Sequence, residues 1–320
     1  MTAAEGPDRR PDRSERLAAA VAEQVAASGF GAAWWLVRRL PEERARSVFD
    51  RAAVLLHRRD GTGVQRLRSN LARVRPDLGP DDLEALTREG VRSYFRYWVE
   101  AFRLPTWPLD DLVARTRTVD EGRLRDPYAE GRGVVVALPH QANWDWAGAW
   151  ACATGMPLMT VAERLRPVRL YDRFVDYRAT LGMRILPLDG GPPTLPVLAE
   201  SLRAGGFVCL LADRDLSRSA VDVDLCGSTA RMPSGPARLA RETGAALVPA
   251  TLAYRDRDLE ITFHEEVLVA DGAHGVAAAM QHVADAFGAG LRKDPQDWHM
   301  MQRVFVADLD ARPAWREVSP

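Results

Sequence analysis

The sequence predicts an α/β fold in which helices cover both faces of a mostly parallel central sheet, with a helical N-terminal elaboration. Residues 1 to about 130 read as mostly helical, whereas after residue 130 short apolar runs alternate with helical segments. Uninterrupted apolar strands of this kind are typical of parallel strands that are covered on both faces. We therefore expect a helical segment over 1–130 and an α/β core over 131–310, joined in one compact domain.

The helices of the N-terminal segment are predicted from capping signals. Ser14 is a candidate N-cap for a helix over residues 14–28. Pro41 and two glutamates open a second helix, which would run to about Arg59 and stop at the following Asp-Gly. Two aspartates at 81 and 82 open a third, which would end before Pro105.

The core elements follow from apolar runs and from the periodic segments between them. The predicted strands are 133–138, 158–162, 184–187, 207–212, 246–253 and 259–267. The predicted helices are 143–154, 169–181, 194–203, 235–243 and 276–289. The longest uncharged stretch, 146–162, has 17 residues, which is shorter than the roughly 20 that a membrane-spanning helix needs.

Composition excludes several classes of function. The chain has 320 residues, 43 of them basic and 44 acidic, and its net charge of -1 does not suit a general nucleic-acid binder. Its three cysteines are far apart, so neither a disulfide framework nor a zinc site is expected. We find no G-x-G-x-x-G, no Walker loop and no metal-binding histidine pair, and we expect neither a metal nor a resident cofactor.

Ionisable side chains follow three of the predicted strands. They are His140 and Asp145 after 133–138, Glu163 and Arg164 after 158–162, and Asp213 and Arg214 after 207–212. Because the carboxyl ends of parallel strands meet at one edge of a sheet, where ligands bind, we expect these groups to converge there.

His140 is the natural general base of this edge, because an imidazole titrates near neutral pH. In a strand–turn–helix, Asp145 on the first helical turn could reach back and fix its tautomer. The alternative is a strand-end histidine bonded to the backbone, with Asp145 merely opening a helix. We find no nucleophile elbow beside it, which favours direct transfer to a substrate hydroxyl activated by the base.

The arginines have two interpretations. Those near the predicted edge could bind phosphates, or they could reflect a chain in which nearly every basic residue is arginine. Residues 1–80 carry 15 arginines against 10 acidic residues, and Trp34 and Trp35 lie among them. Such a segment could lie on an anionic membrane surface. By itself, the pattern slightly favours the alternative of an amphipathic helix packed on the sheet.

The segment VVVALPHQANWDWAG, residues 134–148, resembles the H-x4-D motif of the lipid A acyltransferase-like enzymes. Further similar segments follow in order at 161–167, 170–178, 210–219, 221–227, 232–249 and 294–305. Within this superfamily the chain most resembles the actinobacterial enzymes that acylate phosphatidylinositol mannosides.

The resemblance implies a glycerolipid acyltransferase-like fold and acyl transfer from acyl-CoA to a hydroxyl of a phosphoinositide glycolipid, at the cytoplasmic face of the membrane. It implies that His140 is the proton acceptor, Asp145 its partner and Asp213 a second essential acid. The candidate substrate contacts are Asn143, Glu163, Arg164, Arg178, Arg214, Ser219 and Glu242, with Glu163 and Arg178 as a polar pair near the acyl donor.

Three alternatives remain open from the sequence. The acceptor could be another glycolipid or a lysophospholipid, the protein could be an acyl-CoA thioesterase, or it could bind acyl-CoA without catalysis.

Overall fold

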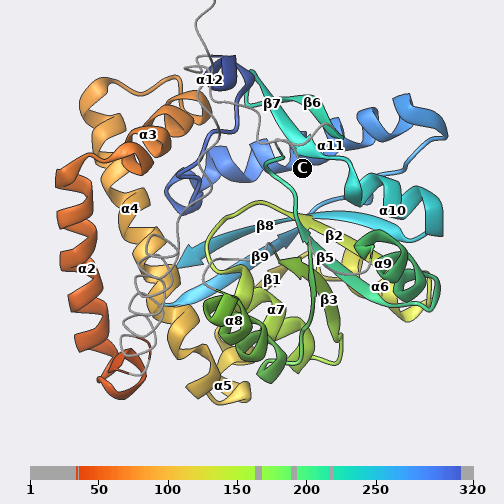
Figure 1. Ribbon diagram of the computed structural model, residues 1–320, viewed down its shortest axis with the longest axis horizontal. Coiled ribbons are helices and arrows are strands. Elements are labelled where there is room, and N and C mark those ends of the chain that lie inside the picture. Colours follow the sequence, from red (N-terminus) through yellow and green to blue (C-terminus); the bar gives the residue numbers. More distant parts are fainter. Residues whose placement is uncertain (1–33, 35, 163–167, 189–192, 216–218, 311–320) are drawn as a thin grey trace, which may run out of the picture.

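The computed structural model describes residues 34, 36–162, 168–188, 193–215 and 219–310 (Figure 1). Its centre is a seven-stranded sheet. In spatial order the strands are β1 (Thr116–Val119), β9 (Asp258–Phe263), β8 (Ala246–Arg255), β2 (Val134–Leu138), β5 (Phe207–Leu211), β3 (Leu158–Ala162) and β4 (Arg184–Pro187).

The sheet is mostly parallel, as predicted. The strands from β8 to β4 all run in one direction, whereas β9 is antiparallel to β8 and β1 is parallel to β9. Strand β1 comes from the segment that was expected to be mostly helical, so the sheet reaches back across the expected boundary at residue 130. A second feature that the sequence patterns did not predict is the antiparallel hairpin of β6 (Ala220–Leu225) and β7 (Ser228–Pro233).

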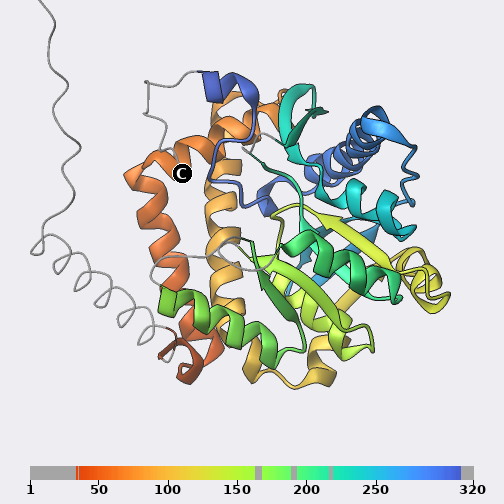
Figure 2. The same ribbon diagram turned by 45° about the vertical axis from the view of Figure 1, so that its right-hand side comes forward.

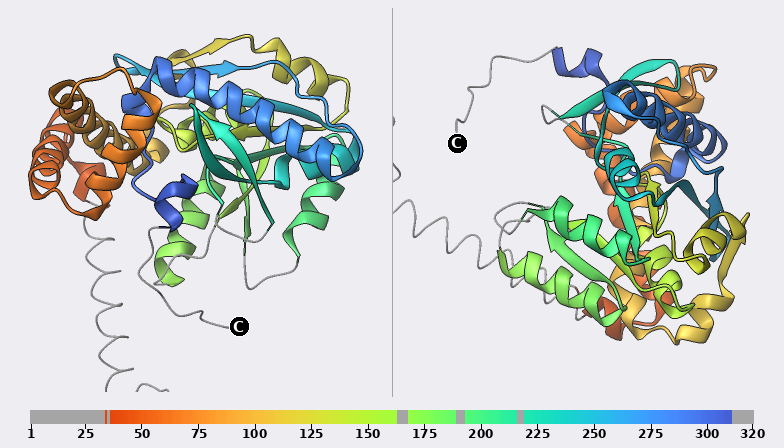
Figure 3. Two further views of the ribbon diagram at one scale, coloured as in Figure 1. Left: turned by 90° about the horizontal axis from the view of Figure 1, so that it is seen from above. Right: turned by 90° about the vertical axis from the view of Figure 1, so that its right-hand side faces the viewer.

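Helices cover both faces of the sheet, because strands such as β2 carry apolar side chains on both faces. Its residues Val134, Val136 and Leu138 pack into one apolar cluster, while Val135 and Ala137 pack into another. The first cluster is completed by α5 (Leu109–Ala114), α6 (Gly122–Ala129), α7 (Trp144–Ala153) and α8 (Val168–Thr180). The second is completed by α9 (Thr194–Arg203), α10 (Gly235–Thr243) and α11 (Gly272–Lys293). Figure 3 shows α11 lying across this second face beside the β6–β7 hairpin.

Three further helices lie together at the edge toward which β8 points (Figures 1 and 2). They are α2 (Glu42–Arg59), α3 (Thr62–Val74) and α4 (Pro80–Arg103). The predicted starts of α2 and α4 are confirmed, with Pro41 before α2 and Pro80 opening α4. α2 ends at Arg59, and Asp60 caps it with a left-handed φ of 45°. The predicted helix over 14–28 lies outside the described residues.

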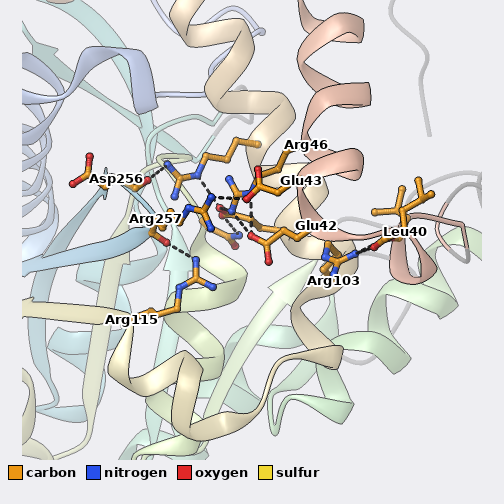
Figure 4. A network of polar contacts seen from close by, with 12 residues as sticks. Leu40, Glu42, Glu43, Arg46, Arg103, Arg115, Asp256 and Arg257 are labelled. Carbon is orange, nitrogen blue, oxygen red and sulfur yellow. Dashed lines mark hydrogen bonds and ion pairs between the residues drawn. The ribbon is translucent and has the colours of Figure 1, made fainter.

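A network of arginines joins α2 to α4 and to the turn between β8 and β9 (Figure 4). Arg46 binds Glu42 on its own helix and the buried Glu100 on α4, at 2.9 and 3.3 Å. Arg257, in the β8–β9 turn, pairs with Glu43. The helical layer is therefore attached to the β8–β9 turn by charged contacts as well as to the core by its apolar face.

Short elements complete the chain: η1 (Leu104–Thr106), η2 (Pro295–Asp297) and α12 (Val306–Asp310). In the part of the chain that the structure describes, no helix is both long and apolar enough to span a membrane.

Candidate active site

The convergence predicted at the carboxyl edge of the sheet is confirmed for two of the three strands. β2 and β5 are parallel neighbours in which Leu138 pairs with Leu211. His140 and Asp213 each follow these residues by two positions, so the register of the sheet brings them together. Glu163 and Arg164, which follow β3, lie outside the described residues.

The contact between His140 and Asp213 is close and doubled. The imidazole Nδ1 lies 2.6 Å from Asp213 Oδ1, and the backbone N–H of His140 donates to Oδ2 at 2.9 Å. A third donor, the indole N–H of Trp298, reaches Oδ2 at 2.8 Å. Asp213 is fully buried, while the His140 side chain is 35% exposed. Asp213 is thus held in a fixed position, while the imidazole of His140 is accessible from solvent.

The electrostatics of the pair fix the tautomer of His140. Burial by itself would raise the pKa of Asp213, but the charge of His140 and the hydrogen bonds from His140 and Trp298 lower it below its ordinary value. An ionised carboxylate only accepts hydrogen bonds, so Nδ1 carries the proton that is donated to Asp213. The Nε2 atom of the neutral ring is then left with a lone pair and can accept a proton.

The loop that carries His140 is held by residues from the far end of the chain. Ala142, at a left-handed φ of 46°, donates its N–H to the carbonyl of Asp297 at 2.8 Å. The N–H of His299 donates to the carbonyl of His140 at 2.8 Å, and a β-bridge joins Gln141 to Trp298. The 294–305 motif had signalled this region, but sequence reasoning missed Trp298 as a residue of the site.

The position of Asp145 corrects the expectation that it orients His140. Asp145 is buried on the first turn of α7 and faces α4 and α8. It accepts hydrogen bonds from Arg178 Nε at 2.6 Å and from the Tyr97 hydroxyl at 3.1 Å. Burial would lower the pKa of Arg178, but Asp145 raises it above its ordinary value. The first helical turn directs Asp145 away from the loop, and the neighbouring parallel strand supplies the partner of His140 instead.

Asn143 is a helix cap. Its Oδ1 accepts the N–H of Trp146 at 2.9 Å, and its Nδ2 donates to Glu100 at 3.2 Å. The side chain is fully buried. Both of its polar ends bind protein groups, which corrects the expectation that this side chain contacts substrate.

The remaining candidates are spread over the fold. Arg214 adjoins Asp213 and donates from Nε to the carbonyl of Arg303 at 3.2 Å. Ser219 is exposed just before β6. Arg178 is paired with Asp145, and its expected partner Glu163 lies outside the described residues.

Glu242 lies at the opposite end of the sheet from His140, which corrects its assignment to the substrate site. It lies in the last turn of α10, which leads into the first residues of β8, and these pair with the start of β2. There Glu242 forms an exposed ion pair with Arg203 at 2.8 Å.

The three cysteines offer no activated nucleophile. Burial raises the pKa of each thiol above its ordinary value, and for Cys209 to about 12. Among the residues that the structure describes, no cluster of histidine, cysteine or acidic side chains is arranged to hold a metal ion.

An apolar cavity of about 790 Å³ lies between η1, α5, α8 and the residues that precede α2. Trp34, Trp107 and Tyr177 are among its walls, and Arg38 and Arg173 also line it. Two leucines of the same elements are strongly exposed: Leu36 at 50% and Leu109 at 58%.

Comparison with known proteins shows the family of the chain. Residues 22–306 match the family model described as bacterial lipid A biosynthesis acyltransferase. The chain is 44% identical over 287 residues to a phosphatidylinositol mannoside acyltransferase of Mycolicibacterium smegmatis, covering 89% of this chain and 93% of that protein. It is also 44% identical over 286 residues to a phosphatidylinositol mannoside acyltransferase of Mycobacterium tuberculosis, covering 88% of each.

Proposed function

This chain belongs to the bacterial lipid A biosynthesis acyltransferase family and is an acyltransferase, and from that premise we propose its reaction. It transfers a long fatty acyl chain from acyl-CoA to a mannose hydroxyl of a phosphatidylinositol mannoside. The observation that carries the chemistry is the His140–Asp213 pair, because the buried carboxylate holds Nδ1–H at 2.6 Å and leaves Nε2 to act as the base.

The reaction proceeds by direct transfer. His140 Nε2 takes the proton of the acceptor hydroxyl as its oxygen attacks the thioester carbonyl, and Asp213 stabilises the imidazolium that forms. The tetrahedral intermediate then collapses, the carbon–sulfur bond breaks, and the imidazolium returns the proton to the departing CoA sulfur. The products are the ester and CoA, and no acyl-enzyme is formed. The raised pKa of all three thiols supports this route.

The names of the two mycobacterial relatives support the choice of acceptor, since each covers nearly the whole chain at 44% identity. Another glycolipid or a lysophospholipid would use the same base in the same way.

The proposed location is the cytoplasmic face of the membrane, where the protein is peripheral. Exposed Leu109 lines a cavity together with Arg38 and Arg173, and exposed Leu36 lies two residues before Arg38 in the chain. Apolar side chains among cationic ones suit a surface made of anionic lipid.

The test is CoA release from palmitoyl-CoA by the purified protein, with and without phosphatidylinositol mannoside in the vesicles. We expect release that depends on the acceptor and falls about 10²–10⁴-fold in His140→Ala. His274→Ala, an exposed histidine on α11, is the matched control and keeps wild-type activity.

Two outcomes contradict the proposal. Release at full rate without acceptor would identify a thioesterase. No release with any lipid acceptor would favour an acyl-CoA-binding protein without catalysis.

A further inference from the structure

The indole of Trp298 gives Asp213 a fixed third hydrogen bond. Oδ1 binds the imidazole, and Oδ2 accepts both the His140 N–H at 2.9 Å and the Trp298 Nε1–H at 2.8 Å. Of these three donors, two belong to His140 itself. Of the three donors, Trp298 is therefore the one that binds the carboxylate from outside His140.

The backbone on both sides of Trp298 is anchored without help from Asp213. The carbonyl of Asp297 accepts the N–H of Ala142, and the N–H of His299 donates to the carbonyl of His140, both at 2.8 Å. The Asp297 carboxylate is held in turn by the Ser93 hydroxyl at 2.7 Å and by the N–H of Tyr254 at 2.9 Å. The indole is fully buried, so its N–H points at Asp213 from a rigid support.

We propose that Trp298 is a positioning residue for the base, which it controls through Asp213. Without the indole, the carboxylate would be held only by the two donors of His140, the residue that it has to orient, and it could turn about its own side-chain bond more easily. The fixed indole N–H prevents this rotation, so Oδ1 stays in line with Nδ1–H and Nε2 stays directed at the acceptor hydroxyl. The inference rests on the proposed function, in which His140 is the general base.

The contact also has an electrostatic effect that packing alone would not produce. The indole N–H shares the negative charge of Asp213 and contributes to its lowered pKa. Without that donor the carboxylate becomes more basic and binds the imidazolium more strongly. A variant that lacks the N–H but keeps the ring should therefore favour the charged form of the imidazole.

The experiment compares Trp298→Phe with Trp146→Phe. Trp146 is a matched control because it is equally buried and its indole N–H is also hydrogen-bonded, to Thr116 Oγ1 at 2.8 Å and to the carbonyl of Leu112 at 3.4 Å. Each variant is assayed for kcat and KM with palmitoyl-CoA and phosphatidylinositol mannoside. The titration of His140 is followed separately by NMR, with its signal assigned through its loss in His140→Ala.

In Trp298→Phe we expect kcat to fall about 10- to 100-fold, KM to change less than twofold, and the midpoint of the His140 titration to move to higher pH. Trp146→Phe should change none of these. Equal kinetics and equal titrations in the two variants would overturn the proposal.

Two measures keep the test decisive. If Trp298→Phe fails to fold, the indole is replaced by benzothiophene through an unnatural amino acid, which keeps the ring shape and removes the N–H. If the wild-type protein shows no acyl transfer, the proposed function fails, but a shifted His140 titration still supports the positioning role and an unshifted one still overturns it.

Discussion

Asp213→Asn tests the His140–Asp213 pair by changing one charge at nearly constant volume. Oδ2 of Asp213 faces two N–H donors, from His140 and Trp298, at 2.9 and 2.8 Å. The amide oxygen of an asparagine would occupy that position, since an NH₂ group there would face two donors. The NH₂ group must then face His140 Nδ1 and donate to it.

That arrangement reverses the tautomer of the imidazole. Nδ1 becomes the acceptor and Nε2 carries the proton, so the ring can no longer take a proton from the hydroxyl. In a catalytic triad the same exchange lowers kcat about 10⁴-fold. We expect a loss of about 10³–10⁴-fold here, equivalent to roughly 4–5 kcal/mol in activation free energy.

The assay is acceptor-dependent CoA release, together with the thermal midpoint of unfolding. Asp145→Asn is the matched control, because it changes another buried carboxylate close to the His140 loop. Its partner Arg178 is only 17% exposed and would keep a buried charge with a weaker partner, at a cost of about 3 kcal/mol in unfolding free energy. We expect Asp145→Asn to lower the midpoint and retain activity at low temperature, whereas Asp213→Asn keeps the midpoint and loses activity.

The reasoning is refuted if Asp213→Asn retains a tenth or more of wild-type kcat. It is also refuted if Asp145→Asn abolishes kcat in a protein whose thermal midpoint is unchanged, because Asp145 would then act on the base.

Three further predictions concern the rest of the fold. Burial lowers the pKa of His299 to about 3, so below pH 6.5 the unfolded chain binds a proton that the folded chain does not. The contribution of His299 to the free energy of unfolding is therefore fully present above that pH and is lost on acidification, by about 2 kcal/mol at pH 5. Urea unfolding should show this decrease of the unfolding free energy with falling pH in His274→Gln but not in His299→Gln. Glu242→Gln should keep kcat and both KM values within twofold in the CoA-release assay, since it lies at the far end of the sheet; a tenfold rise in the KM for acyl-CoA would contradict its placement. Gly133 has a φ of 74°, and a Cβ there would lie 2.3 Å from a carbonyl oxygen of α9. Gly131 also has a left-handed φ, but a Cβ there would meet nothing within 4 Å. Gly133→Ala should therefore lower the free energy of unfolding more than Gly131→Ala does.

Local patterns were sufficient for most of the elements. The strands 158–162 and 184–187 and the helices 194–203 and 235–243 have the boundaries that the sequence predicts. Apolar runs, glycines and capping residues act within a few positions along the chain, and so they can be read directly. The β6–β7 hairpin was missed because its strands alternate exposed and buried residues and carry charges, which weakens the apolar signal.

The sequence by itself determined the fold class and the edge at which His140 and Asp213 meet, because both depend on the order of the strands and on the residues directly after each strand. Only the tertiary structure decided the partners. It paired His140 with Asp213 because β2 and β5 are parallel neighbours, turned Asp145 to Arg178, and brought Trp298 in from the end of the chain. Hydrogen bonds require particular atoms within about 3 Å, and sequence spacing does not specify which atoms tertiary packing brings to that distance.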